Sequence, residues 1–242
     1  MTTIFPATDK QDLAVKVAER FIALVRDIQD SEGGAHDDGI ARVVLTGGSS
    51  GLAVLEALAQ TAHSHELDWS RIEFFFGDER NVPVDDSESN EGQARRVLLD
   101  QLEIPAHRVH GYSLSGGNDL TERADDYTAE IKEFAPAGFD IHLLGLGDDG
   151  HINSLFPNHA GLNDDATVIT VTDSPKPPAQ RLSLGLSQLA FADRIWFLAA
   201  GKNKADAVAR LVSTEGSGQD CPATLVHGRI ETLLFSDVIP AH

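Results

Sequence analysis

The chain has 242 residues, of which 41% are hydrophobic, and its 19 Lys and Arg against 38 Asp and Glu give a formal net charge of −19 at pH 7. This length and apolar fraction are typical of a globular protein with a sizeable core and exclude a disordered chain. The negative charge repels phosphate backbones and anionic lipids, so we expect no nucleic-acid and no membrane partner. An anionic ligand must therefore be held by a few well-placed cations and backbone N–H groups.

Cysteine usage and the first residues set the expected compartment. Cys221 is the single cysteine, which excludes an intrachain disulfide and a four-thiolate zinc site. Residues 1–15 carry acids and Lys10 where a signal peptide needs an apolar run, and no stretch approaches the roughly 18 apolar residues of a membrane span. We therefore expect a cytoplasmic protein.

Hydrophobic patterning predicts alternating helices and strands. Apolar residues at helical spacing predict a helix over 9–29, with Thr8 and Gln11 as a capping box, and further helices at about 50–62, 90–102, 119–134 and 202–213. Apolar runs predict strands at 40–45, 72–76, 139–144, 168–172 and 194–199, the last strong strand, with a short one at 109–112. This order predicts one α/β domain over residues 1–242, a doubly wound, mainly parallel, Rossmann-like sheet with helices on both faces. Ligands of such sheets bind at the carboxyl ends of the strands.

The segment TGGSSG at 46–51 follows a predicted strand and opens a predicted helix. Its Gly47, Ser49 and Gly51 satisfy G-x-S-x-G, the nucleophile elbow of α/β-hydrolases, but too few elements precede Ser49 to supply that fold's oxyanion loop. In a second interpretation, the backbone N–H groups of Gly47, Gly48 and Ser49 face an anion at the helix N-terminus. In a third interpretation, the segment is an ordinary strand-to-helix turn with a serine cap.

The segment GLGDDG at 145–150 spells G-x-G-x-x-G after a strand, as in dinucleotide-binding folds. Its two acids would lie beside a pyrophosphate, and Pro157 stops the following helix too early, so we expect no dinucleotide cofactor. The same loop presents His151, and Asp149 two residues earlier is placed to orient the imidazole as a general base. A capping Asp followed by an ordinary helix-start His is the alternative.

Three cations follow predicted strands or loops on the ligand side, namely Arg80, Arg181 and Lys204. Each alone is explained by a surface ion pair with the many acids. Together, beside a Gly-rich turn and a candidate base, they predict an anion clamp. The pair His63 and His65 has no nearby cysteine, so we expect no metal site there.

The order of five blocks across residues 45–205 resembles the family of 6-phosphogluconolactonases and glucosamine-6-phosphate deaminases. The blocks are LTGGSSG at 45–51, FFFGDERNVPVDDSESN at 74–90, LLGLGDDGHINSLFP at 143–157, SPKPPAQR at 174–181 and GKNKA at 201–205. Arg80 in DER and the run GHINSLFP are similar to the lactonase branch, because the deaminase branch reads D-E-Y and G-H-I-A-F-N-E-P. The departures at Asn153, where the family more often has a small residue, and at 158–159 touch no expected chemical role.

The resemblance implies hydrolysis of 6-phospho-D-glucono-1,5-lactone to 6-phosphogluconate, the second step of the oxidative pentose phosphate pathway, with no cofactor and no metal. In the implied site, His151 is the base and Asp149 supports it. Contacts with the phosphate or the oxyanion come from Arg80, Arg181 and Lys204 and from the N–H groups of Gly47, Gly48 and Ser49. Asp78 and Asn90 provide supporting or sugar contacts.

Two other functions stay open at this point. One is a deaminase or isomerase of an amino-sugar phosphate, with a carboxylate such as Asp78 as the proton-transfer base. The other is a non-catalytic sugar-phosphate sensor, which the intact His151 and the lack of a basic helix-turn-helix disfavour. The expected partner is a small sugar-phosphate lactone, and the expected assembly is a monomer or small homo-oligomer.

Overall fold

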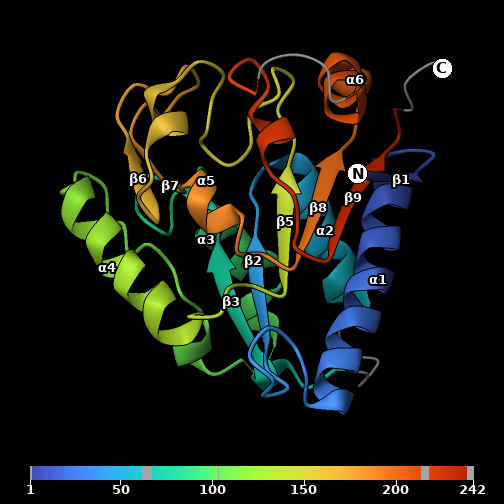
Figure 1. The fold of residues 1–242 in the computed structure, drawn as a ribbon. Coiled ribbons are helices and arrows are strands. Elements are labelled where there is room, and N and C mark those ends of the chain that lie inside the picture. The colour runs from blue at the N-terminus through green and yellow to red at the C-terminus, as the bar shows by residue number, and fades with distance from the viewer. Residues whose placement is uncertain (1, 62–66, 103, 214–217, 239–242) are drawn as a thin grey trace.

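The computed structural model describes residues 2–61, 67–102, 104–213 and 218–238. Six parallel strands form its main sheet in the order β1-β9-β8-β5-β2-β3 (Figure 1). They are β1 (Thr3–Pro6), β2 (Ala41–Leu45), β3 (Ile72–Phe76), β5 (Ile141–Gly145), β8 (Arg194–Ala199) and β9 (Glu231–Ser236). Strands β2 and β3 are buried at every residue, as expected for a sheet covered on both faces. The predicted α/β fold with a mainly parallel sheet is confirmed.

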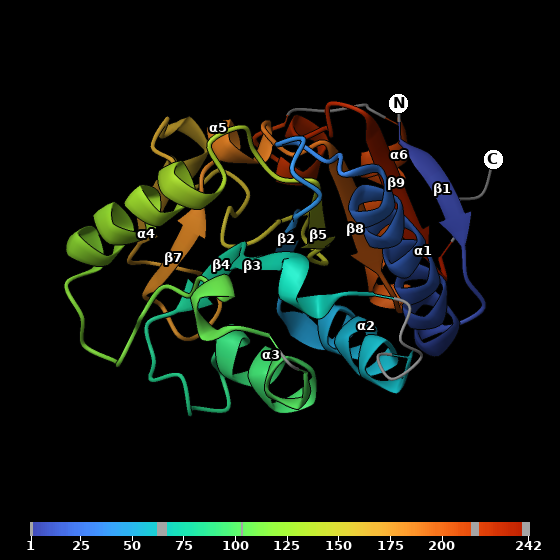
Figure 2. The same ribbon diagram turned by 90° about the horizontal axis from the view of Figure 1, so that it is seen from below.

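Helices flank this sheet on both sides. They are α1 (Lys10–Ser31), α2 (Gly48–Thr61), α3 (Asn90–Val97), α4 (Leu120–Phe134), α5 (Leu186–Leu189) and α6 (Ala205–Ser213), with 3₁₀ turns at Trp69–Arg71, Leu99–Gln101, Ala106–Arg108, Ala160–Asn163, Lys202–Lys204 and Pro222–Leu225. Figure 2 shows α1, α2 and α3 side by side on one face, with α4 and α5 on the other side of the molecule. Within the described ranges, no helix combines the length and apolarity needed to cross a membrane.

A second, antiparallel sheet has the order β4-β7-β6 and lies beside the main one. It consists of β4 (Asp78–Arg80), β6 (Val168–Val171) and β7 (Arg181–Leu184). The segment 168–172 is thus a strand as expected, but it belongs to this smaller sheet. The sequence did not predict β1, β4, β7 and β9. Strands β1 and β4 are short, polar or at a sheet edge, so their extended conformation depends on long-range pairing. Strand β9 is instead a buried inner strand that pairs with both β1 and β8.

Several boundaries differ from the prediction. The start of α1 is capped by the Asp9 carboxylate, which accepts from the N–H of Asp12, instead of by the expected Thr8 and Gln11 box. The helix after residue 90 ends at Val97, because Leu98 leaves the helical conformation with φ −139° and ψ −60°. Segment 109–112 forms only one bridge, between Val109 and Phe74, and no strand. The expected helix end at 62 and the pair His63 and His65 lie outside the described residues.

Chain connectivity reverses between β2 and β5. From β2 the chain continues outward to β3, whereas from β5 it continues in the opposite direction to β8 and β9. Ligands of open α/β sheets bind at such a switch point, outside the carboxyl ends of the strands. The loops that follow β2, β3, β5 and β8 meet there, and they contain the residues singled out from the sequence.

Candidate active site

A cavity of about 150 Å³ lies at the carboxyl ends of the parallel strands. It is lined by Thr46, Gly47, Gly48, Ser49, Ser50, Asp78, Arg80, Asn90, Gly145, Leu146, Gly147, His151, Asn153, Arg181, Leu198 and Lys204. Every site residue predicted from the sequence lines this cavity except Asp149, which contacts His151. The structure therefore brings the predicted set together in one place.

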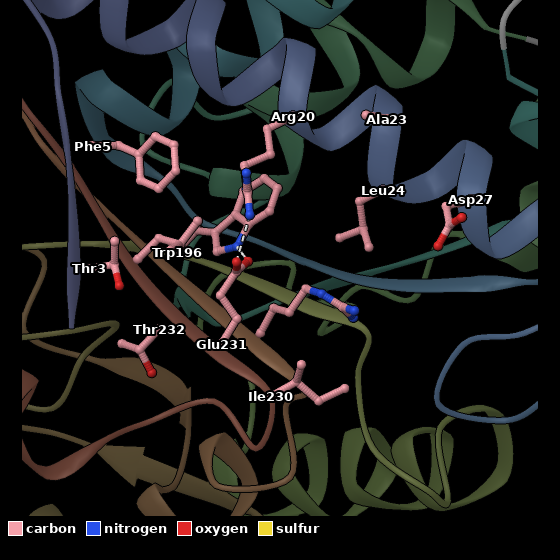
Figure 3. A pocket seen from close by; sticks show the side chains of 12 residues that line it. Thr3, Phe5, Arg20, Ala23, Leu24, Asp27, Trp196, Ile230, Glu231 and Thr232 are labelled. Carbon is pink, nitrogen blue, oxygen red and sulfur yellow. Dashed lines mark hydrogen bonds and ion pairs between the residues drawn. The ribbon is translucent and has the colours of Figure 1, made fainter. Parts of the chain in front are cut away.

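A larger cavity of about 710 Å³ lies near the amino ends of β1, β8 and β9, beside α1 (Figure 3). Its Arg20 is already paired with Glu231, at 2.6 Å between Nη2 and Oε2, and Trp196 donates its indole N–H to the same carboxylate. This cavity has no histidine, cysteine or serine among its lining residues that could act as a base or nucleophile. The smaller cavity is therefore the better candidate for chemistry.

His151 and Asp149 form a pair at the edge of the smaller cavity. The ring Nδ1 of His151 lies 2.5 Å from Asp149 Oδ1, and the His151 backbone N–H also donates to that oxygen. Burial alone would raise the pKa of Asp149, but the hydrogen bond and charge of His151 outweigh burial and hold the pKa well below its usual range. An ionised Asp149 assigns the ring proton to Nδ1. Because no hydrogen bond reaches Nε2 from the described residues, that nitrogen is free to act as a base.

The neighbouring Asp148 is engaged elsewhere. Its Oδ1 lies 2.6 Å from Nζ of Lys176, which joins the loop after β5 to the proline-rich loop at 174–180. Asp148, Asp149 and His151 each offer one ligand atom within 4.8 Å of the others. Two of these donors are already ion-paired, and exposed carboxylates commonly lie this close without a cation. The absence of a resident metal accordingly stays a prediction.

The Gly-rich turn opens α2 toward the cavity. Helix α2 starts at Gly48, whose φ of +79° is readily adopted only by glycine. A Cβ on Gly47 would lie 1.9 Å from Asn90 Oδ1, so a larger residue there would displace Asn90. No hydrogen bond joins the Ser49 hydroxyl to an imidazole anywhere in the described ranges. The geometry therefore favours the anion-binding interpretation of this turn over the nucleophile elbow.

Arg80 and Lys204 supply positive charge to the cavity in different ways. Arg80 donates through Nη1 to the backbone carbonyl of Glu88 at 2.5 Å, while its buried Nε has no partner. Lys204 follows a turn at Gly201, and its ammonium has no hydrogen bond or ion pair with any residue that the structure describes. Burial lowers the pKa of Lys204. Both cations retain donors that a bound anion could use.

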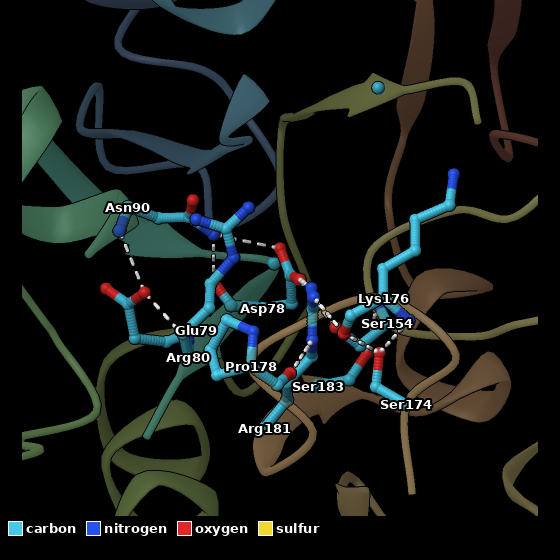
Figure 4. Close-up of polar contacts among 12 residues, drawn as sticks. Asp78, Glu79, Arg80, Asn90, Ser154, Ser174, Lys176, Pro178, Arg181 and Ser183 are labelled. Carbon is cyan, nitrogen blue, oxygen red and sulfur yellow. Dashed lines mark hydrogen bonds and ion pairs between the residues drawn. The ribbon is translucent and has the colours of Figure 1, made fainter. Parts of the chain in front are cut away.

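Arg181 is largely committed to the protein itself (Figure 4). Its Nε donates to the carbonyl of Pro178, and its Nη2 donates to the carbonyls of Lys176 and Pro177. Burial lowers the pKa of Arg181, although the guanidinium stays charged. Only Nη1, which lies 4.0 Å from Asp78 Oδ2, remains without a hydrogen bond. Arg181 thus positions the proline-rich loop and has little capacity left for a ligand.

Both carboxylate oxygens of Asp78 accept a hydrogen bond. Asn90 Nδ2 donates to Oδ1 at 3.1 Å, and Ser154 Oγ donates to Oδ2 at 2.7 Å. Asn90 Nδ2 also donates to the Asp78 backbone carbonyl, while Asn90 Oδ1 is buried without a partner. These bonds fix the orientation of the Asp78 carboxylate, as expected of a supporting residue. Each of its oxygens keeps a second lone pair, and Asp78 lines the cavity, so the base role of the deaminase alternative stays open.

Glu79 does not line the cavity but holds two residues that do, and the sequence analysis missed this role. Its buried carboxylate accepts from the backbone N–H groups of Arg80, Asn90 and Glu91 at 2.8 Å each and from the Ser89 hydroxyl at 3.0 Å. Burial raises the pKa of Glu79 to about 7, against these hydrogen bonds. The carboxylate ties β4 to the start of α3 and so holds Arg80 and Asn90. The available signal was the acid of the DER segment, followed eleven residues later by the start of a helix.

Asn153, to which the sequence analysis assigned no chemical role, also lines the cavity. It lies in the turn that follows His151 and lines the same space. Asn158 and His159, the other departures from the family pattern, do not line the cavity.

Comparisons with known proteins identify relatives of this chain. The model of the family described as glucosamine-6-phosphate isomerases/6-phosphogluconolactonase matches residues 8–235. The chain is 40% identical over 240 residues to a 6-phosphogluconolactonase of Streptomyces coelicolor, covering 95% of this chain and 89% of that protein. It is 42% identical over 211 residues to the 6-phosphogluconolactonase of Mycobacterium tuberculosis, covering 82% and 83%.

Solved structures show the same fold. The crystal structure of 6-phosphogluconolactonase from Thermotoga maritima superposes with a TM-score of 0.83 at 29% identity, covering 98% of this chain and 99% of that one. A monomeric glucosamine-6-phosphate deaminase superposes with a TM-score of 0.77 at 21% identity, covering 97% of each chain, and shows the fold alone. With a family match over nearly its whole length and relatives above 40% identity, the chain belongs to the glucosamine-6-phosphate isomerase/6-phosphogluconolactonase family.

Proposed function

We propose that the protein hydrolyses 6-phospho-D-glucono-1,5-lactone to 6-phospho-D-gluconate. The observation that carries the proposal is the His151 and Asp149 pair, whose free Nε2 borders a cavity that also holds a helix N-terminus and the side chains of Arg80 and Lys204. A lactone is an activated ester, so a positioned base, a water molecule and oxyanion stabilisation suffice for its hydrolysis. No cofactor is needed for these steps.

His151 is the proposed base for water. Its Nε2 takes a proton from water while the water oxygen bonds to C1 of the lactone, and the carbonyl electron pair moves onto the carbonyl oxygen. The resulting oxyanion collapses, the bond between C1 and the ring oxygen breaks, and the imidazolium returns its proton to the ring oxygen as a hydroxyl. Asp149 keeps Nδ1 protonated and stabilises the transient imidazolium, as in other carboxylate–imidazole pairs.

Phosphate and oxyanion are the two negative charges that the site must hold. Lys204 and Arg80 have unused donors, and the N–H groups of Gly47, Gly48 and Ser49 lie at the positive end of the α2 dipole. We assign phosphate binding to this group of cations and amides. Asp78 and Asn90 then position Arg181 and the cavity wall, because their polar atoms are mostly paired within the protein.

Turnover of freshly prepared lactone tests the proposal directly. The rate of acid release is measured with and without enzyme, since the lactone also hydrolyses spontaneously. The proposal predicts saturable hydrolysis well above the spontaneous rate and no ammonia release from glucosamine 6-phosphate. Hydrolysis at the spontaneous rate contradicts it, and binding of 6-phosphogluconate without turnover would instead support the sensor function.

The proposal includes a single catalytic domain over residues 1–242, a cytoplasmic location and a monomeric or small homo-oligomeric state. The compartment is supported by the lone, buried Cys221, because a free thiol is typical of a reducing environment. Light scattering after size-exclusion chromatography measures the assembly.

A further inference from the structure

Arg210 of α6 holds the loop that presents His151, residues 146–151, which we call the base loop. Its Nη2 donates to the backbone carbonyl of Asp149 at 3.0 Å, and its Nη1 donates to the carbonyl of Asp220 at 3.0 Å. Within the described ranges, the bond from Arg210 is the only hydrogen bond that the Asp149 carbonyl accepts. Arg210 itself does not line the cavity, so it acts on a ligand there through the residues that it holds.

The base loop turns sharply at Gly150, directly after the residue that Arg210 holds. Gly150 has a φ of +91°, and a Cβ there would lie 2.6 Å from Cys221 Sγ, so the chain around Cys221 packs directly against the turn. The Ala223 N–H donates to the Gly150 carbonyl at 3.1 Å. The carbonyls of two successive residues, Asp149 and Gly150, are therefore fixed from outside the loop, one by a side chain and one by the backbone.

The backbone of Asp149 decides where its carboxylate lies. Oδ1 of that carboxylate contacts both the backbone N–H and the ring Nδ1 of His151, so a small rotation of the Asp149 peptide would weaken both contacts. Catalytic groups tolerate little displacement, since a shift of about 1 Å can lower a rate about 10²-fold. Arg210 contacts the carbonyl of Asp149 and not its carboxylate, so it fixes the residue without competing for the oxygen that faces His151.

We propose that Arg210 is a positioning residue for lactone hydrolysis, which holds the Asp149 carboxylate against Nδ1 of His151 by fixing the Asp149 backbone. This assignment rests on the proposed lactonase function and goes beyond it, because it names a residue outside the cavity on which the general base depends. Lys204 directly precedes α6 and lines the cavity, so one helix connects the proposed phosphate site with the base loop. The two roles are separable, because Lys204 binds substrate charge whereas Arg210 orients the base.

Arg210→Gln tests this role through the division of its effect between kcat and KM. The variant should lower kcat roughly five- to thirty-fold and leave KM within about two-fold of wild type, because no substrate contact is lost. The same loss in kcat should appear on 6-phospho-D-glucono-1,5-lactone and on glucono-1,5-lactone, in contrast to Lys204→Ala. A loss confined to the phosphorylated lactone would place Arg210 in the phosphate site and overturn the assignment.

A double-mutant cycle with Asp149→Ala separates positioning from general damage to the fold. If Arg210 acts through the Asp149 carboxylate, Arg210→Gln should lower kcat by less than about two-fold once that carboxylate is absent. A loss of the same size with and without the carboxylate would contradict the positioning role. Absence of wild-type turnover on the phosphorylated lactone would overturn the proposed function instead, so the two failures are distinguishable.

Arg210→Lys and Arg229→Gln are the conservative variant and the matched control. Lysine keeps a cation but lacks the planar fork that spans two carbonyls, so its kcat should lie between those of wild type and Arg210→Gln. Arg229 pairs with Asp193 before the amino ends of β8 and β9 and does not line the cavity, so Arg229→Gln should leave kcat unchanged. Thermal melts show which variants are folded in the assay. Wild-type kcat in folded Arg210→Gln would overturn the assignment.

Discussion

Of the histidines that contact carboxylates, His151 and His110 lie in contrasting regions of the molecule. His151 sits at the cavity edge, paired through Nδ1 with Asp149 at 2.5 Å, while its Nε2 has no partner in the described chain. His110 is buried between the rings of Phe75 and Phe134, each 4.5 Å away between centroids. Its Nε2 lies 2.8 Å from Glu73, and its Nδ1 lies 3.6 Å from Glu130.

The difference separates a catalytic pair from a structural one. A general base needs one nitrogen that is oriented by a partner and another that faces the substrate, and His151 meets both conditions. At His110 both nitrogens face acids, and the ring lines neither of the two cavities described above. The same residue types therefore support chemistry in one region and stability in the other. The comparison predicts opposite effects of substitution at the two positions.

His151→Ala should have the largest effect on catalysis. Loss of a general base lowers kcat by a factor on the order of 10²–10⁴, while substrate affinity should change little because His151 is not assigned to phosphate binding. Steady-state kinetics corrected for spontaneous hydrolysis measure both parameters. Turnover close to wild type in this variant would remove the proposed mechanism.

Lys204→Ala should impair the phosphorylated lactone selectively. A charge-assisted hydrogen bond to phosphate contributes roughly 1.5–3 kcal/mol, which corresponds to about a ten- to hundred-fold loss in kcat/KM. Glucono-1,5-lactone, which has no phosphate, should be much less affected. Lys202→Ala is the control, because Lys202 is an exposed cation of the same turn and does not line the cavity. Equal losses on the two lactones would exclude Lys204 from the phosphate site.

His110→Gln should reduce stability and leave catalysis unchanged. Burial alone would lower the pKa of His110, but its contacts with Glu130 and Glu73 outweigh burial and raise the pKa above 6.5. Breaking a buried ion pair costs about 3 kcal/mol, or about 6–12 °C in Tm for a protein of this size.

The pH dependence of this effect has a definite sign. A raised pKa in the folded state means that the folded protein holds the His110 proton more tightly than the unfolded chain does. The stabilisation is complete below pH 6.5 and is lost as the pH rises through the raised folded value. The difference in Tm between wild type and His110→Gln should therefore shrink from pH 6 toward alkaline pH. A difference that grows with pH would show that Arg108, which pairs with Glu73, dominates this cluster.

Ser49→Ala should have the smallest effect of this series. If the turn at 46–51 binds an anion through its backbone, the hydroxyl contributes little, and we expect activity within about three-fold of wild type. Wild-type protein should also resist labelling by a fluorophosphonate, which mass spectrometry detects. An adduct on Ser49 would instead indicate a covalent hydrolase mechanism.

The predictable part of the fold was encoded locally. Strands β3 and β8 match their predicted bounds because apolar residues dominate both segments. The span of α4 follows from Asp119, which caps its first turn. Strands β4 and β7 could not be predicted in this way. Asp78–Arg80 is a charged tripeptide whose extended conformation depends on pairing with a segment about a hundred residues later.

The candidate site was likewise predictable only where its contacts are local in the sequence. His151 and Asp149 are two residues apart, so their contact followed from the sequence. The role of Arg181 did not, because its hydrogen bonds go to backbone carbonyls of the proline-rich loop, which no side-chain pattern reveals. The place of Asn153 in the cavity wall was not predicted either. The orientation of its side chain depends on a left-handed backbone angle and on contacts with the distant Gly77 and His142.

The pH dependence of kcat from pH 5 to 7.5 tests the central claim most directly. In this range spontaneous hydrolysis is subtracted at each pH, and protonation of the imidazole removes the base. The account predicts that wild-type kcat falls on the acid side with a single protonation, and that the residual activity of His151→Ala lacks this fall. An acid-side fall of the same shape and midpoint in His151→Ala would assign the titrating base to another residue and contradict the role of His151.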